Sequence, residues 1–375
     1  MNYFKIILII FFTCLFSCKK TNKGIEATNV SKFEYAKGFS IEEYQGCKKV
    51  SIFNPYKDAS KKYEYLLVPR DSIIPEHKNT VQVIHIPIER IVVTSTSHIP
   101  LLELLDEEKS LVGFPNTNFI SSKKTRALVD SKNIKELGKA ENLNTELLLE
   151  LHPELVMSFA VDKPNKSFLT LQKMGVPILL NGDWLEETPL GRAEWIKLFG
   201  ALYNKEKQAN LIFENIKNEY EAAKLLAEKA SYKPTVLSGS IFQDVWYLPA
   251  GESFIAQYFN DANTNYLWKD SKGTGSLSLN FENVFAKGQA ANFWIGCGMN
   301  RSKEQLISSN DHYQKFRAFQ EDKVFTFANY RGETGGMFYF ELAPIQPHII
   351  LKDIIKVTHP ELLPNYTPVF FEQLK

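Results

Sequence analysis

The stretch KEKQANLIFENIKNEYEAAKLLAEKA, residues 205–230, decides the organisation of this chain. It is the longest helical pattern in the sequence, without glycine or proline, and its apolar residues recur every three or four positions. These residues are Ala209, Ile212, Phe213, Ile216, Tyr220, Ala223, Ala227 and Ala230. With the usual rise per residue the helix would be about 39 Å long, enough to run across two lobes. We therefore predict a stiff connector helix at residues 205–231.

Strand and helix patterns alternate on both sides of this connector. Before it, strands are expected at residues 91–94, 110–114, 154–159 and 176–180, with helices at 100–105, 145–151 and 166–174. After it, strands are expected at 235–238, 291–297 and 324–328, with helices at 253–260, 281–286, 302–316 and 343–357. Such alternation predicts an α/β fold with two doubly wound lobes, each a mostly parallel sheet flanked by helices. The lobes span residues 46–204 and 232–375, and early strands at 49–54, 63–68 and 81–86 extend the first sheet.

Composition sets the class of protein. A chain of 375 residues with 44% hydrophobic residues is long enough for two folded domains. Its 44 basic and 43 acidic residues leave a net charge of +1, so the chain lacks the excess of basic residues that is typical of nucleic-acid-binding proteins. We therefore exclude nucleic-acid binding.

The first residues have the pattern of a secretion signal. An apolar run at 6–12 follows Lys5 and is too short to span a bilayer, so residues 1–17 are interpreted as a signal peptide. Leu15-Phe16-Ser17-Cys18 resembles a bacterial lipobox, which predicts a lipid on Cys18 and a polar tether at residues 18–45. A plain signal peptide with a coincidental cysteine is the alternative. In the mature chain Cys47 and Cys297 remain, and whether they pair is open.

A short motif occurs once in each lobe. Asn144-Thr145-Glu146 and Asn280-Phe281-Glu282 each precede a predicted helix. In both, the asparagine can cap the helix and the glutamate falls in the first turn, where the helix dipole favours negative charge. Each lobe would thus present one exposed carboxylate in the same setting, which suits a two-fold symmetric partner.

Ligands of open α/β sheets bind at the loops that follow the carboxyl ends of the strands. In this chain those loops carry mainly aromatic and hydroxyl side chains with one cation, which suits a large, partly apolar ligand. The candidate ligand-binding residues are Ser97, His98, Phe114, Phe159, Trp184, Trp246, Tyr247, Trp294, Tyr330 and Arg331. His98 could ligate the metal of a bound chelate, or could simply be hydrogen-bonded at a helix start.

Motifs of catalysis and of resident metal binding are missing from the sequence. It has no GxSxG, HExxH or P-loop, and the glycine-rich residues 332–336 do not open a helix after a strand. The seven histidines do not fall in a metal-ligand spacing. We expect no catalytic residue, no metal site and no cofactor.

The chain resembles the class III periplasmic binding proteins of ABC importers for iron-siderophores, haem and cobalamin. The resemblance rests on residues 91–98, on 144–156, on the connector helix and on 280–282. In that family, glutamates on the two lobes dock into arginine pockets of the paired permease subunits, and Glu146 and Glu282 stand at the matching positions. In lobe one the motif is followed by the proline and acidic residue Pro153-Glu154, and the second motif is not followed by such a pair. The second motif therefore matches the family pattern less closely.

This resemblance implies a monomeric lipoprotein anchored to a membrane in the periplasm. It would capture a metal chelate between its lobes, with no cofactor of its own, and deliver it to a permease dimer with ATPase subunits. Two alternatives remain open from the sequence: a two-lobed enzyme such as a glycosyltransferase, and a receptor for a free metal ion.

Overall fold

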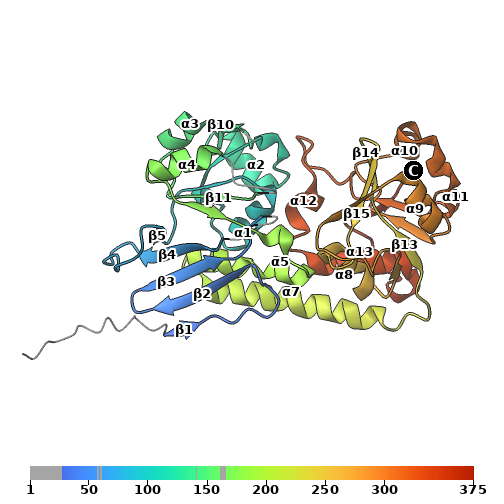
Figure 1. Ribbon diagram of the computed structural model, residues 1–375, viewed down its shortest axis with the longest axis horizontal. Coiled ribbons are helices and arrows are strands. Elements are labelled where there is room, and N and C mark those ends of the chain that lie inside the picture. Colours follow the sequence, from blue (N-terminus) through green and yellow to red (C-terminus); the bar gives the residue numbers. More distant parts are fainter. Residues whose placement is uncertain (1–27, 57–58, 60, 141, 161–165) are drawn as a thin grey trace, which may run out of the picture.

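The computed structural model describes residues 28–56, 59, 61–140, 142–160 and 166–375. Two lobes sit side by side, and one long helix, α7 (Glu206–Ala227), runs beneath both (Figure 1). Its 22 residues give a length of about 33 Å. The predicted stripe faces the core, since the buried residues of α7 are Ala209, Phe213, Ile216, Tyr220, Ala223 and Ala227. The prediction of two lobes joined by one long helix is confirmed.

The N-terminal lobe is built on a parallel sheet of five strands in the order β12-β11-β6-β7-β8. The strands are β6 (Ile91–Val93), β7 (Leu111–Phe114), β8 (Lys135–Glu136), β11 (Leu155–Ser158) and β12 (Ile178–Leu180). The helices of this lobe are α1 (Ile99–Leu104), α2 (Lys123–Asp130), α3 (Thr145–Glu150), α4 (Lys166–Lys173), α5 (Pro189–Glu194) and α6 (Ile196–Leu202). A two-stranded ribbon, β9 (Gly138–Lys139) with β10 (Asn142–Leu143), precedes α3.

The C-terminal lobe repeats this plan. Its main sheet has the order β16-β13-β18-β19-β20, parallel except at β20. The strands are β13 (Thr235–Leu237), β16 (Asn265–Tyr266), β18 (Phe293–Ile295), β19 (Val324–Thr326) and β20 (Glu372–Gln373). A small antiparallel sheet adds β14 (Ser240–Phe242), β15 (Val245–Pro249) and β17 (Ser276–Leu279). The helices are α8 (Phe254–Asp261), α9 (Phe281–Gly288), α10 (Lys303–Ser309), α11 (Arg317–Gln320), α12 (Phe338–Leu342) and α13 (Pro347–Thr358).

The region before β6 forms a separate five-stranded sheet rather than an extension of the first lobe's sheet. It contains β1 (Asn29–Val30), β2 (Phe39–Tyr44), β3 (Cys47–Ile52), β4 (Tyr63–Pro69) and β5 (Gln82–Ile86). The prediction of a tether through residue 45 is therefore wrong from residue 29 onward. Two carboxylates distant in sequence hold this segment: Glu194 accepts the backbone N–H groups of Tyr35 and Ala36 at 2.8 Å each, and Glu186 that of Gly38 at 2.9 Å.

One smaller prediction is wrong, and one open question is answered. The helix predicted at residues 302–316 breaks at Asn310, whose extended backbone ends α10 and whose side chain accepts the N–H of His312 at 2.9 Å. Cys47 and Cys297 are both buried and unpaired, so no disulfide joins them. Cys18, the signal peptide and the start of the tether lie outside the described residues. Within the described part of the chain, no helix combines the length and apolarity needed to cross a bilayer.

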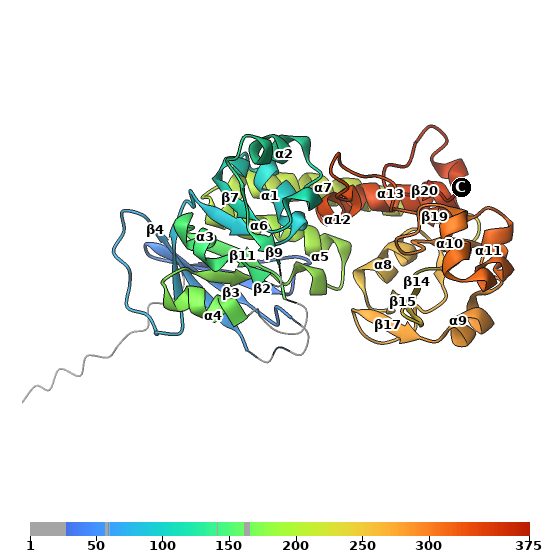
Figure 2. The same cartoon turned by 90° about the horizontal axis from the view of Figure 1, so that it is seen from above.

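The lobes also contact each other through the segment that follows β19. Seen from above, α12 lies against the N-terminal lobe (Figure 2). The buried carboxylate of Glu341 on α12 accepts the backbone N–H groups of Ser121 (2.7 Å) and Ser122 (2.8 Å) at the start of α2. The Thr334 hydroxyl donates to the carbonyl of Asn118 at 2.7 Å. We call this contact between residues 332–341 and 118–122 the lobe bridge.

Candidate ligand site and docking helices

A cavity of about 480 Å³ lies between the two lobes. The N-terminal lobe supplies loops that follow β6, β7 and β11, and the C-terminal lobe supplies loops that follow β18 and β19. This is the edge of the sheets where an α/β fold places its ligand. The described lining residues are Thr94, Ser95, Thr96, Phe114, Pro115, Asn116, Phe119, Ala140, Phe159, Met299, Arg331, Gly335, Gly336, Met337 and Phe340.

Aromatic and thioether side chains dominate the open surface of this inter-lobe cleft. Phe119, Phe159, Met299 and Phe340 line it, and all four are exposed although they are large and apolar. Such a surface suits a large, partly apolar ligand. Sequence reasoning named Phe159 but missed the other three, because their lobes meet only in the folded protein.

Arg331 is the one charged side chain among the described lining residues. Its Nε donates to the carbonyl of Ala328 at 2.7 Å and its Nη1 to that of Gly335 at 2.9 Å, which fixes the side chain. The protein contacts given for the described residues leave its Nη2 free to meet a ligand acceptor. The cleft therefore offers one positive group, which favours a ligand with an anionic or strongly polar part.

Three of the predicted ligand residues, Phe114, Phe159 and Arg331, line the inter-lobe cleft. Ser97 lies beside it, where its hydroxyl pairs with that of Ser95 at 2.8 Å. Tyr330 does not line the cleft but stacks on Phe338, with the ring centroids 4.4 Å apart.

Two predicted tryptophans belong to the core instead. Trp246 and Trp294 have no exposed surface and stack on each other at 5.4 Å between centroids. Their indole N–H groups donate to the carbonyls of Ser238 (3.1 Å) and Gly239 (2.9 Å). The prediction that they contact ligand is wrong for this conformation, because strand alternation turns Trp246 inward and its neighbour Tyr247 outward.

His98 and Trp184 are enclosed as well. His98 is buried, and its ring lies 6.0 Å from that of Phe199. Neither of its ring nitrogens has a hydrogen-bond partner in the described structure, and burial lowers its pKa to about 4. Trp184, partly buried, has an indole N–H that is buried without a partner there. Neither lines the inter-lobe cleft, so the proposed metal contact of His98 is not supported.

The described lining of the cleft contains no His, Cys, Asp or Glu side chain. The described residues contain no group of three or more His, Cys, Asp or Glu side chains that could hold a metal.

The two predicted docking helices have matched geometry. Asn144 accepts the N–H of Leu147 at 3.0 Å at the start of α3, and Asn280 accepts the N–H of Asn283 at 2.9 Å at the start of α9. The predicted caps are therefore confirmed. Glu146 and Glu282 are both exposed in the first turn of their helices. In Figure 1 the two helices lie one in each lobe, α3 at the top of the left lobe and α9 at the outer right, below α10.

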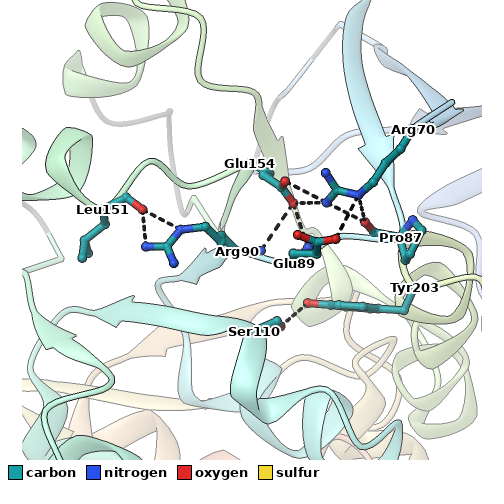
Figure 3. Close-up of polar contacts among 8 residues, drawn as sticks. All are labelled: Arg70, Pro87, Glu89, Arg90, Ser110, Leu151, Glu154 and Tyr203. Atoms are coloured by element: carbon teal, nitrogen blue, oxygen red, sulfur yellow. Dashed lines mark hydrogen bonds and ion pairs between the residues drawn. The ribbon is translucent and has the colours of Figure 1, made fainter.

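A polar cluster at the other end of α3 fixes its position (Figure 3). Arg90 donates to the carbonyl of Leu151, just past α3, at 2.9 Å from Nε and 2.6 Å from Nη2. Glu154 accepts two contacts of 2.7 Å from Arg70 and the backbone N–H of Glu89 at 2.7 Å. These bonds hold the pKa of Glu154 below its usual value despite partial burial. The cluster joins the end of α3 to the N-terminal sheet, which is the sheet of strands β1–β5, through Arg70, the residue after β4.

Residues 91–330 match the family model described as Periplasmic binding protein. This chain belongs to the periplasmic binding protein family. Members of the family bind solutes and are not enzymes, which removes the enzyme alternative. The match begins at β6, so the N-terminal sheet lies before it.

This periplasmic binding protein is also similar to other known proteins. An uncharacterized lipoprotein of Methanocaldococcus jannaschii is 25% identical over 94% of this chain and 87% of its own length. The periplasmic haem-binding protein HutB of Vibrio cholerae has a similar fold, with a TM-score of 0.54 at 15% identity, covering 70% of this chain and 99% of its own. A protein of an ABC-type Fe3+-hydroxamate transport system from Saccharomonospora viridis also has a similar fold, with a TM-score of 0.54 at 13% identity. The similarity covers 73% of this chain and 94% of that protein.

Proposed function

We propose that this periplasmic binding protein is the substrate-binding lipoprotein of an ABC importer and that it captures a metal chelate in the inter-lobe cleft. The observation that carries the proposal is the chemistry of that cleft. Exposed aromatic and methionine side chains surround one fixed arginine, and the described residues hold no metal-ligand group. A ferric siderophore, a corrinoid or haem each combines an apolar or flat surface with polar groups, and each brings its metal already ligated.

Delivery to the permease is the second part of the proposal. Glu146 and Glu282 are exposed at the starts of capped helices, one per lobe, and would pair with arginines on the two permease subunits. The mature protein would carry lipid on Cys18, be held at a membrane in the periplasm and act as a monomer. The lipoprotein name of the archaeal relative supports this location.

Binding and transport can be tested separately. Purified protein is titrated with ferric trihydroxamate, cobalamin and haemin while its intrinsic tryptophan fluorescence is recorded, and at least one is expected to bind. Glu146→Lys combined with Glu282→Lys should abolish uptake by cells and leave the affinity for that chelate unchanged. Glu150→Lys is the matched control, since Glu150 is exposed on the same helix α3 but lies at its other end.

The outcomes that contradict the proposal differ for its two parts. If no chelate of the panel binds, the proposed cargo class is wrong. If the double variant transports as well as the control, the docking role is wrong. Replacing Cys18 by Ala should release the protein from the membrane fraction, and its persistence there would refute the lipid anchor.

A further inference from the structure

A second cavity of about 480 Å³ lies inside the C-terminal lobe. It lies among the small sheet β14–β15–β17 and helices α8 and α13, with the loops that follow β13 and β18 on its border. The cavity is open to solvent, because Phe242 and Tyr247 in its lining are exposed, and ligand pockets measure about 300–1,000 Å³. The size of this space is therefore that of a ligand site.

The walls of this C-lobe cavity are mostly apolar. Leu248, Ile255, Ile350 and Ile354 supply aliphatic surface, and Phe259 and Phe371 supply aromatic surface. The described lining residues include no charged side chain. An ionic group would lose its hydration there without a partner, so the cavity selects an uncharged, largely hydrocarbon group.

Polar side chains also border the cavity, namely four serines, Asn300 and two tyrosines, Tyr258 and Tyr339. Tyr258 is 4% exposed, and the described residues provide no hydrogen-bond partner for its hydroxyl or for that of Tyr339. Nearby buried tyrosines differ, because the hydroxyl of Tyr220 donates to Asp261 at 2.7 Å and that of Tyr266 to the carbonyl of Pro249 at 2.5 Å. These two unpaired hydroxyls border the C-lobe cavity and can each donate to an acceptor on a bound ligand.

The C-lobe cavity and the inter-lobe cleft share one described lining residue. Met299 lines both spaces and is 52% exposed, and it follows Gly298, whose φ of +72° turns the chain at this point. A methionine side chain is flexible and adapts to different neighbours. A ligand with its head in the cleft can therefore extend past Met299 into the lobe.

We propose that the C-lobe cavity is a second subsite that takes an uncharged hydrocarbon arm of the chelate bound in the inter-lobe cleft. The cargo would then be amphiphilic, with a polar metal-binding head near Arg331 and an apolar arm that carries an acceptor, such as an amide or ester carbonyl, for Tyr258 and Tyr339. This inference rests on the proposed function for the head group and adds the arm.

The test compares two ligands that differ only in the arm: a linear ferric trihydroxamate, and the same chelate with a long alkyl amide. A dansyl-labelled long-chain fatty acid serves as a third probe that requires no metal. The alkylated chelate should bind at least about tenfold more tightly than the short one, because each buried methylene contributes about 0.8 kcal/mol.

Filling the cavity should remove this preference. Ile255→Trp puts a large ring into the cavity from α8 and should weaken the alkylated chelate and the fatty acid by about tenfold or more, with the short chelate unaffected. Asn260→Trp, exposed on the same helix and outside the lining, is the matched control and should change none of the three affinities. Tyr247→Glu puts a charge on an exposed lining residue and should weaken the fatty acid even if Ile255→Trp folds poorly.

The results separate the two proposals. The subsite would be overturned if the wild-type protein bound the short and the alkylated chelates equally well. It would also be overturned if the wild type, Ile255→Trp and Tyr247→Glu bound the fatty acid with equal affinity. Binding of the fatty acid that is blocked by Ile255→Trp, with no binding of any chelate, would support the subsite and refute the proposed cargo class.

Discussion

Replacing Glu341 by Gln tests the lobe bridge. The Glu341 carboxylate is buried and contacts the backbone N–H groups of Ser121 and Ser122 in the opposite lobe. Burial is the main cause that raises its pKa from 4.5 to about 7, and the nearby charge of Glu103 adds to it. Glutamine keeps the shape and one acceptor oxygen but cannot ionise.

The sign of the pH dependence follows from that shift. The folded protein binds the proton of Glu341 more tightly than the unfolded chain, whose carboxyl has the ordinary pKa of 4.5. The stabilising effect is therefore complete below pH about 4.5 and is lost as the pH rises through about 7. A shift of this size corresponds to about 3 kcal/mol, at about 1.4 kcal/mol per pKa unit.

Urea unfolding of both proteins at several pH values measures this effect. The free energy of unfolding of the wild type, relative to Glu341→Gln, should fall by about 3 kcal/mol between pH about 4.5 and about 8. The variant is the internal control, because every other titrating group is present in both proteins. If the two stabilities run parallel across this range, the carboxyl does not titrate as inferred and the reasoning is refuted.

Two further substitutions test contacts that hold the lobes together and position helix α3. Gly336→Ala would place a β-carbon 2.2 Å from the carbonyl oxygen of Phe119 across the lobe bridge, so it should lower the melting temperature. Gly275→Ala, which has open space around it, is the control and should leave the melting temperature unchanged. Equal melting temperatures of the two variants would show that the lobe bridge can shift without loss of stability. Arg70→Ala leaves Glu154 without its guanidinium partner and, because both side chains are partly exposed, should cost about 1 kcal/mol in urea unfolding. Lys272→Ala, whose ion pair is exposed, is the neutral comparison, and equal stabilities of the two variants would contradict the role given to the Arg70 cluster.

The sequence predicts those parts of the fold that depend on local patterns. The apolar stripe of α7 requires only helical spacing, and the caps at Asn144 and Asn280 only an asparagine before a helix. The fold of residues 29–44 was missed because Glu186 and Glu194, which hold this segment, lie about 150 residues further along the chain. No local pattern carries that information.

The ligand site was predicted less well for a related reason. The position of the inter-lobe cleft at the strand ends follows from topology, and Phe114, Phe159 and Arg331 line this cleft as predicted. When both sides of a short strand are apolar, as with Trp246 and Tyr247, the sequence does not predict which side faces the core. Met299 and Phe340 acquire their role only when two lobes meet, so periodicity within either lobe could not reveal it.

The lobe bridge has a practical consequence for measuring ligand capture. Since α7 spans both lobes and Glu341 ties them a second time, their separation has little room to change. A pair of dyes placed on the two lobes to report distance would give a weak signal. A single dye sensitive to polarity, attached at the exposed position of Phe340 in the cleft wall, would instead report the replacement of water by ligand.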